Sequence, residues 1–258
     1  MKKYLCAVAV WLGLISCQPT SETAVSSSKA QRIIDQAIAA HGGDALQQTH
    51  ISFDFRKKHY EVALDQGKFV YESTGPDSIG FVHDVLTNQG FTRSVDHQPL
   101  ELNEEKQSQY GNSLNSVVYF VLLPYPLNDP AVNQEYLEET SVQGEPYHKI
   151  RVTFSQEGGG DDFDDEYIYW IHREQHTMDY LAYSFHVNGG GTRFRKAYNV
   201  REIEGIRFAD YVNYESTVAD FELENYDQLF EEGKVEELSR IETRNVRVRK
   251  EEKPTAGA

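Results

Sequence analysis

The greatest concentration of metal-ligating side chains in this sequence is an acidic run that follows three glycines. Asp161, Asp162, Asp164 and Asp165 stand close together, with Glu166 directly after them. Calcium takes about six to eight oxygen ligands, and a glycine-rich loop could bring several carboxylates onto one ion. The spacing does not match the EF-hand loop. We therefore interpret the run as a solvated hairpin tip, with a cation site at these four aspartates as the alternative.

Two histidines, His172 and His176, stand four residues apart and would share one face of a helix, as zinc ligands do. Their flanks alternate as strands with a turn between, so that geometry is not expected. The sequence also contains no nucleophile elbow, phosphate loop or dinucleotide motif. No cofactor is expected. Acid and histidine pairs from distant strands leave no local signature, which keeps a hydrolase or lyase open as an alternative function.

A second candidate site is an apolar segment that ends at a proline-rich loop. Seven apolar residues in a row are too few to cross a membrane, which takes about 20, and they must bury against protein or ligand. Pockets with an apolar lining and few polar groups suit lipid-like ligands. The alternative is that the same side chains simply fill the core. The candidate ligand contacts are Val117, Val118, Tyr119, Phe120, Val121, Leu122, Leu123, Tyr125 and Leu127.

The N-terminus carries a third chemical signal. Lys2 and Lys3 precede an uncharged apolar stretch, residues 4–15, which has the length of a signal-peptide core and is too short to span a bilayer. The stretch ends in Leu-Ile-Ser before Cys17. This pattern resembles the lipobox of bacterial lipoproteins. The resemblance implies that residues 1–16 are removed and that Cys17 carries fatty acyl chains such as palmitate. An ordinary secretory signal is the alternative.

The segment after the cysteine predicts how the protein is held at the membrane. Residues 17–29 are rich in serine and threonine and are expected to form a flexible tether. Several acyl chains anchor a protein stably, whereas one does so only marginally. By analogy with lipoprotein sorting, Gln18 in place of an aspartate favours the outer membrane. Only Glu22 is acidic in the stretch from residue 18 to residue 28, which favours the periplasmic face over the cell surface.

Composition narrows the classes of function. The chain has 258 residues and a net charge of −16, which becomes −18 without Lys2 and Lys3. Such a charge argues against nucleic-acid binding, which relies on lysine and arginine. The two cysteines are Cys6, within the removed segment, and Cys17, so no disulfide is expected. The 16 tyrosines and 13 phenylalanines favour strands.

Periodicity predicts a mainly β protein with two helical parts. A helix is expected over residues 29–41, ended by two glycines, and a second helical stretch over 103–123. Residues 220–232 are ambiguous, and residues 251–258 are expected to be a disordered tail. No linker interrupts residues 30–250, which predicts a single β-rich domain. The expected strands of an antiparallel meander are 50–56, 60–64, 68–72, 80–86, 90–95, 134–142, 147–156, 164–172, 178–187, 192–202 and 206–217, with 236–249 as a closing edge strand.

Four features in this order resemble a known group of proteins. They are the His-Gly-Gly end of the first helix at residues 41–43, Val-Val-Tyr-Phe-Val-Leu-Leu-Pro at 117–124, Tyr-Ile-Tyr-Trp-Ile at 167–171, and the Asn-to-Phe stretch at 199–208. The chain resembles, over residues 30–217, an uncharacterised family of Bacteroidota lipoproteins with a fold similar to the lipoprotein-sorting proteins LolA and LolB. The resemblance implies a curved antiparallel sheet, or incomplete β-barrel, whose open face is covered by the N-terminal helix and the helical insertion.

The resemblance also implies a cavity that holds acyl chains, as in the sorting proteins. Soluble carriers of that group lack a lipid anchor, so this chain resembles the anchored receptor instead, and no motif specific to lipoprotein transfer is present. We therefore expect a membrane-anchored periplasmic lipoprotein that binds a hydrophobic or lipid-like small molecule in a half-barrel cavity. The bilayer is its expected partner, through acylated Cys17. A structural subunit of an envelope complex is a further alternative, and the sequence does not indicate an oligomeric state.

Overall fold

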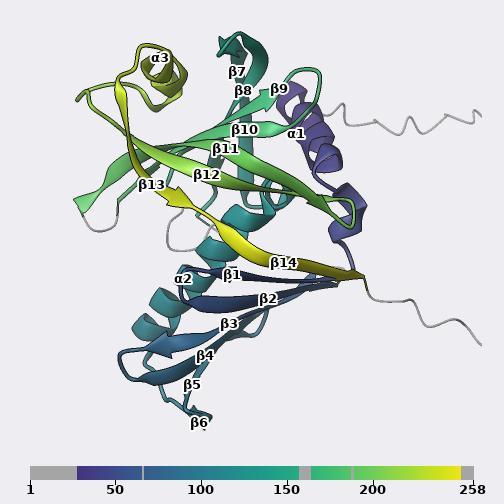
Figure 1. Cartoon of the computed structure of the whole chain (residues 1–258), viewed down its shortest axis with the longest axis vertical. Coiled ribbons are helices and arrows are strands. Elements are labelled where there is room, and N and C mark those ends of the chain that lie inside the picture. Colours follow the sequence, from purple (N-terminus) through teal and green to yellow (C-terminus); the bar gives the residue numbers. More distant parts are fainter. Residues whose placement is uncertain (1–27, 66, 157–163, 187–188, 251–258) are drawn as a thin grey trace, which may run out of the picture.

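The computed structural model describes residues 28–65, 67–156, 164–186 and 189–250. Within these ranges the chain forms two seven-stranded antiparallel sheets and three α-helices (Figure 1). The predicted signal peptide, Cys17 and the predicted tail lie outside the described residues. None of the described helices has the length and apolar content needed to pass through a bilayer.

The first sheet is a meander of consecutive hairpins, to which a strand from the end of the chain adds at one edge. Its order is β14-β1-β2-β3-β4-β5-β6. Short turns containing Gly67 and Gly90, both with positive φ, join neighbouring strands. The strands are β1 (Thr49–Phe55), β2 (Lys58–Asp65), β3 (Lys68–Asp77), β4 (Gly80–Thr87), β5 (Gly90–Val95), β6 (Gln98–Pro99) and β14 (Thr243–Lys250).

The second sheet follows the same plan in the order β13-β12-β11-β10-β9-β8-β7. Its strands are β7 (Val132–Val142), β8 (Glu145–Phe154), β9 (Tyr167–His172), β10 (Met178–Phe185), β11 (Gly191–Ile203), β12 (Ile206–Ser216) and β13 (Val235–Ile241). Every residue of β9 is buried. Tyr169 and Ile171 face one hydrophobic cluster and Ile168 and Trp170 another, because successive side chains point to opposite faces. This sheet is therefore covered on both sides.

Within the described ranges, three α-helices and the short 3-10 turns η1, η2 and η4 cover the sheets. α1 (Lys29–Ala40) and the turn η2 (Tyr125–Asn128) pack on one face of the second sheet, and α3 (Tyr226–Glu231) with η4 (Leu223–Asn225) packs on the other. The turn η1 (Gly43–Leu46) leads from α1 into β1. α2 (Glu104–Leu122) contacts both sheets. Figure 1 shows α2 running from the lower sheet towards the upper one. The predicted mainly β fold class, with an N-terminal helix and a helical insertion, is confirmed.

The end of the chain differs from the prediction. A single edge strand was expected over residues 236–249, but the chain bends at Glu242. β13 pairs with β12 at the edge of the second sheet, and β14 pairs with β1 at the edge of the first. In Figure 1 this yellow segment crosses from one sheet to the other. The segment thus provides one edge strand of each sheet and connects the two sheets directly along the chain.

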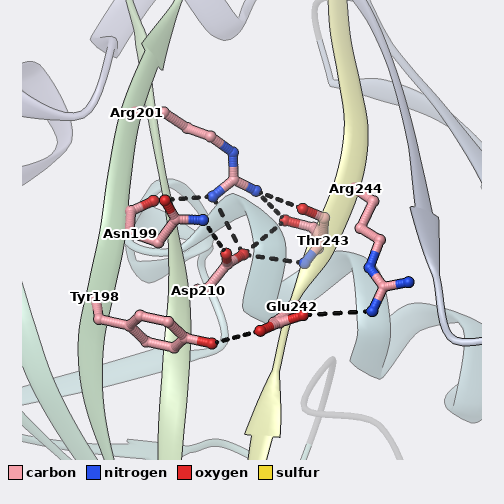
Figure 2. Close-up of polar contacts among 7 residues, drawn as sticks. All are labelled: Tyr198, Asn199, Arg201, Asp210, Glu242, Thr243 and Arg244. Carbon is pink, nitrogen blue, oxygen red and sulfur yellow. Dashed lines mark hydrogen bonds and ion pairs between the residues drawn. The ribbon is translucent and has the colours of Figure 1, made fainter.

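The bend is fixed by the buried carboxylate of Asp210 on β12 (Figure 2). Its oxygens accept hydrogen bonds from Asn199 Nδ2 at 2.6 Å, Arg201 Nη1 at 3.1 Å and the backbone N–H of Thr243 at 3.0 Å. Arg201 also donates to the Thr243 carbonyl at 2.8 Å. Asn199 has a φ of 47° and lies where the β11–β12 register shifts. This Asp210 network therefore connects β11, β12 and the first residue of β14.

A more exposed pair of contacts flanks the network. Tyr198 donates its hydroxyl to Glu242 at 2.9 Å, and Arg244 forms an ion pair with the same carboxylate at 3.4 Å (Figure 2). The Glu242 side chain is 40 % exposed. Exposed ion pairs contribute little because water screens them.

We predict that Asp210→Ala destabilises the protein by roughly 3 kcal/mol, since it leaves the Arg201 guanidinium and the Thr243 N–H without their buried acceptor. The measurement is urea unfolding of the purified protein, followed by fluorescence of the buried Trp170. Glu242→Ala, at the bend itself but with a partly exposed carboxylate, is the control and should cost less than about 1 kcal/mol. Equal losses in the two variants would contradict the role given to Asp210.

The docking of α1 depends on a histidine that must stay neutral. His41, buried at the end of the helix, has its Nδ1 2.8 Å from the Ala37 carbonyl, and its Nε2 accepts from the Met178 N–H at 3.4 Å. A neutral ring that donates at Nδ1 and accepts at Nε2 satisfies both contacts. Burial lowers the pKa of His41 from 6.5 to about 4.

This lowered pKa makes stability depend on pH. Between pH 6.5 and 4 the unfolded chain binds a proton at His41 that the folded chain does not, so stability is lost as the pH falls through this window, by up to about 3 kcal/mol. His41→Gln cannot titrate, so we expect urea unfolding to show a shallower decline for this variant than for the natural protein. Parallel stability curves from pH 7 to pH 4 would refute the assignment.

Candidate functional site

Two stripes of side chains on α2 face different surroundings. Leu114, Val118 and Leu122 recur at every fourth position and pack with Ile51 and Phe53 of β1 in the hydrophobic cluster of the first sheet. The neighbouring stripe, with Val117, Phe120 and Val121, follows the same helical spacing. This second stripe forms one wall of a cavity.

The cavity has a volume of about 410 Å³ and lies between α2 and strands of both sheets. Sites for small molecules generally span about 300–1,000 Å³, so its size suits one small ligand. Its apolar lining consists of Phe55, Val117, Phe120, Val121, Tyr167, Tyr183, Phe185, Ala209, Tyr211 and Ile241. Its polar lining consists of Arg56, Ser113, Ser116, Asp165, Arg193, Arg195 and Thr243.

The position of the cavity follows from the crossover between the sheets. Ile241 is the last residue of β13 and Thr243 is the first of β14, and both line the cavity on either side of the bend. Ala209 and Tyr211 flank Asp210 along β12 and also line it. Side chains alternate along a strand, so Asp210 points to the opposite face from these two. The Asp210 network therefore holds one wall of the cavity from behind.

Aromatic side chains form one wall of the cavity. The Phe120 ring lies 5.4 Å from that of Tyr183, and the Tyr167 and Tyr183 rings stack at 5.5 Å. Burial raises the pKa of Tyr211 to about 12 and raises that of Tyr167 further still. Both phenols are therefore neutral at physiological pH, and this wall offers rings and hydroxyl groups, not charge.

The charged groups of the lining come from three strands and the segments beside them. Arg193 and Arg195 stand two apart on β11 and share the inner face, and Arg56 follows β1. Arg193 forms an ion pair with Glu215 at 3.7 Å. Asp165 is buried and lies 3.4 Å from Nδ1 of His186, an exposed ring outside the lining. The described lining itself contains no histidine.

The predicted ligand segment divides into cavity residues and core residues. Val117, Phe120 and Val121 line the cavity. Tyr119 packs on the second sheet with its hydroxyl 3.2 Å from that of Tyr169, and Tyr125 packs beside the cluster of the first sheet. The remaining members, which lie in the core, are Val118, Leu122, Leu123 and Leu127. Part of the segment therefore borders the cavity, as a ligand-binding segment would, and part of it fills the core.

Several cavity residues were not identified from the sequence. Tyr183, Phe185, Arg193 and Arg195 come from the hairpin of β10 and β11. The alternation of Arg193, Phe194 and Arg195 could have indicated two arginines on one strand face with an apolar residue on the other. Which face of β11 borders the cavity depends on where α2 packs, and the alternation along one strand does not reveal this.

The predicted acidic site is only partly within the described residues. Asp161 and Asp162 lie outside them, whereas Asp164 is exposed and Asp165 turns towards the cavity. In the ranges that the structure describes, no group of three or more histidine, cysteine, aspartate or glutamate side chains is arranged to hold a metal ion. At the other weak candidate, His172 Nδ1 accepts hydrogen bonds from the backbone N–H groups of Glu174 and Gln175. The cation site at the four aspartates stays a prediction.

Fold and site together define a class: two antiparallel sheets joined by a segment that crosses between them, with a helix bordering a partly open, mostly apolar cavity. The chain belongs to the family of unknown function DUF6503, whose model matches residues 9–243. A comparison with curated proteins finds no match.

Two solved structures illustrate what the fold is similar to. One is a DUF1329 family protein from Desulfovibrio piger, with a TM-score of 0.52 and 10 % identity, over 86 % of this chain and 93 % of that one. The other is a LolA superfamily protein from Nitrosomonas europaea, with a TM-score of 0.49 and 14 % identity, over 86 % and 94 %. At these identities the similarity concerns the fold alone.

Proposed function

We propose that this protein is a lipid-anchored envelope lipoprotein that binds a hydrophobic or amphipathic small molecule in the cavity beneath α2. The observation that carries the proposal is the cavity itself, whose walls are mostly aromatic and aliphatic side chains from α2 and both sheets. An alkyl chain placed there would contribute about 25 cal/mol for each Å² of apolar surface removed from water.

The architecture suits reversible binding. One wall consists of paired strands that share a buried core, whereas the other is a single helix whose cavity stripe ends in the exposed serines Ser113 and Ser116. The cavity is partly open to solvent, and a small displacement of α2 would widen it without breaking any strand pairing. The side of α2 that faces the first sheet would stay packed through Leu114, Val118 and Leu122.

The proposed anchor would bring the cavity close to a membrane, from which a lipid-like ligand could enter. Acylated Cys17 would hold the domain at the periplasmic face of the outer membrane, and α1 begins at Lys29. Fully extended, the tether over residues 17–29 would reach about 40 Å. The cavity would then lie within reach of a bilayer, where lipid-like molecules are concentrated.

We predict that Val117→Trp fills the cavity and lowers ligand capture at least about fivefold, since an indole ring replaces space that an alkyl chain would occupy. The full chain in its own membranes is labelled with a photoactivatable alkyl probe, and the labelled peptides are mapped by mass spectrometry. In the natural protein, the label should fall on residues 113–121 and on the β10–β12 strands.

Val200→Trp provides the matched control, because Val200 lies on β11 with 46 % of its surface exposed and does not line the cavity. This variant should label like the natural protein. Labelling spread evenly over the exposed surface, or unchanged in Val117→Trp, would count against the cavity as a binding site.

The anchor is tested separately. Cys17→Ala should abolish incorporation of labelled palmitate and leave residues 1–16 attached, because the thiol that is acylated before cleavage is lost. Cys6→Ala, within the predicted signal peptide, should change neither result. If the Cys17→Ala protein still incorporates palmitate or still loses residues 1–16, the lipoprotein assignment is wrong.

A further inference from the structure

One buried charged side chain of the cavity lining has no carboxylate partner among the residues that the structure describes. Arg195 is 8 % exposed and lines the cavity from the middle of β11. Its Nη2 donates to the Tyr183 hydroxyl at 2.8 Å, while its buried Nε has no hydrogen-bond partner. Among the described residues, no carboxylate forms an ion pair with Arg195. From this geometry we propose that the cavity ligand is an amphiphile with a single anionic head group, whose oxygens contact Arg195.

The cost of burying the guanidinium supports this assignment, which rests on the proposed function. An ion removed from water is stabilised in a protein by an opposite charge and by hydrogen bonds, and an apolar residue would fill the same position without that cost. Arg195 has partial compensation from aromatic faces, with Cζ 3.9 Å from the Phe120 ring centre and 4.9 Å from that of Tyr183. These contacts orient the group and leave its Nε donor unsatisfied.

Other arginines of the same sheet are paired, which sets Arg195 apart. Arg207 on β12 also has a buried Nε without a partner, but its Nη2 lies 3.0 Å from Asp179. Arg201 contacts Asp210, and Arg193 contacts Glu215. A carboxylate or phosphate can accept two parallel hydrogen bonds from the fork of a guanidinium. A ligand anion would give Arg195 the partner that Asp179 gives Arg207.

The rest of the cavity favours one anionic group and not several. Arg56 and Arg193 line it as well, but Asp165 adds a negative charge to the same lining. The remaining surface is mainly rings and aliphatic groups, among them Val117, Val121 and Ile241. A volume of about 410 Å³ is near the lower end for small-molecule sites and suits one alkyl chain better than two. The ligand class is therefore a single-chain alkyl carboxylate or alkyl phosphate.

The test compares photoactivatable probes that share one alkyl chain and differ only in the head group: a carboxylic acid, a phosphate and a neutral alcohol. The full chain in its own membranes is labelled at increasing probe concentration at pH 7.5. We expect half-maximal labelling of residues 113–121 at an at least about tenfold lower concentration for an anionic probe than for the alcohol, as charge-assisted hydrogen bonds are the strong class. Whether the carboxylic acid or the phosphate labels at the lower concentration identifies the head group.

Arg195→Met removes the charge and keeps much of the volume. It should remove the advantage of the anionic probe and leave labelling by the alcohol within about twofold, and Arg195→Lys should keep part of the advantage. Arg207→Met is the matched control, because Arg207 lies in the same sheet but does not line the cavity, and it should retain the full advantage. The comparison of probes on the natural protein needs no variant, so it decides the matter even if Arg195→Met fails to fold.

The outcomes separate this inference from the function on which it rests. Equal labelling of the cavity peptides by acid, phosphate and alcohol in the natural protein would overturn the anionic head group and keep the cavity as an apolar site. An advantage that persists in a folded Arg195→Met protein would overturn the role of Arg195. Absence of label from the cavity peptides with every probe would overturn the binding function itself.

Discussion

The structure depends on one constraint, which is that a single stretch of chain must serve two sheets. β13 completes the edge of the second sheet and β14 that of the first, and only Glu242 stands between them. A bend so sharp leaves backbone groups that neither sheet can pair, and buried backbone groups need partners. Asp210 accepts from the Thr243 N–H, and Arg201 donates to the Thr243 carbonyl. The orientation of the two sheets therefore depends on the polar network around the buried carboxylate of Asp210.

The cavity is a consequence of that orientation. Two sheets joined at an angle cannot pack face to face along their whole length, and α2 fills the space between them. Its Leu114, Val118 and Leu122 stripe packs in the core beside the first sheet, while the adjacent stripe borders the cavity. Strand β12 takes part in both the Asp210 network and the cavity wall. Asp210 holds the crossing strand on one face, and its neighbours Ala209 and Tyr211 line the cavity on the other.

The charge pattern separates the surface from the interior. The chain carries 41 acidic residues against 25 lysines and arginines, yet three arginines line the cavity beside a single aspartate. The acidic surface would oppose the approach of an anion from solution, whereas a ligand that arrives from a membrane with its alkyl chain is driven mainly by apolar burial. An interior guanidinium would then select among such ligands by head group and contribute specificity more than driving force.

The sequence by itself determined the mainly β class, the N-terminal helix with its glycine end, the helical insertion and most strands, because these depend on local periodicity and turn residues. It also placed Val117, Phe120 and Val121 in a candidate ligand segment, although it could not separate them from Val118 and Leu122, since both stripes are apolar. Only the tertiary structure decided the split of residues 236–249 into two strands and the turning of Arg195 towards the cavity. Both depend on contacts between segments far apart in the chain, such as Asp210 with Thr243 and Phe120 with Arg195, and local patterns carry no information about such contacts.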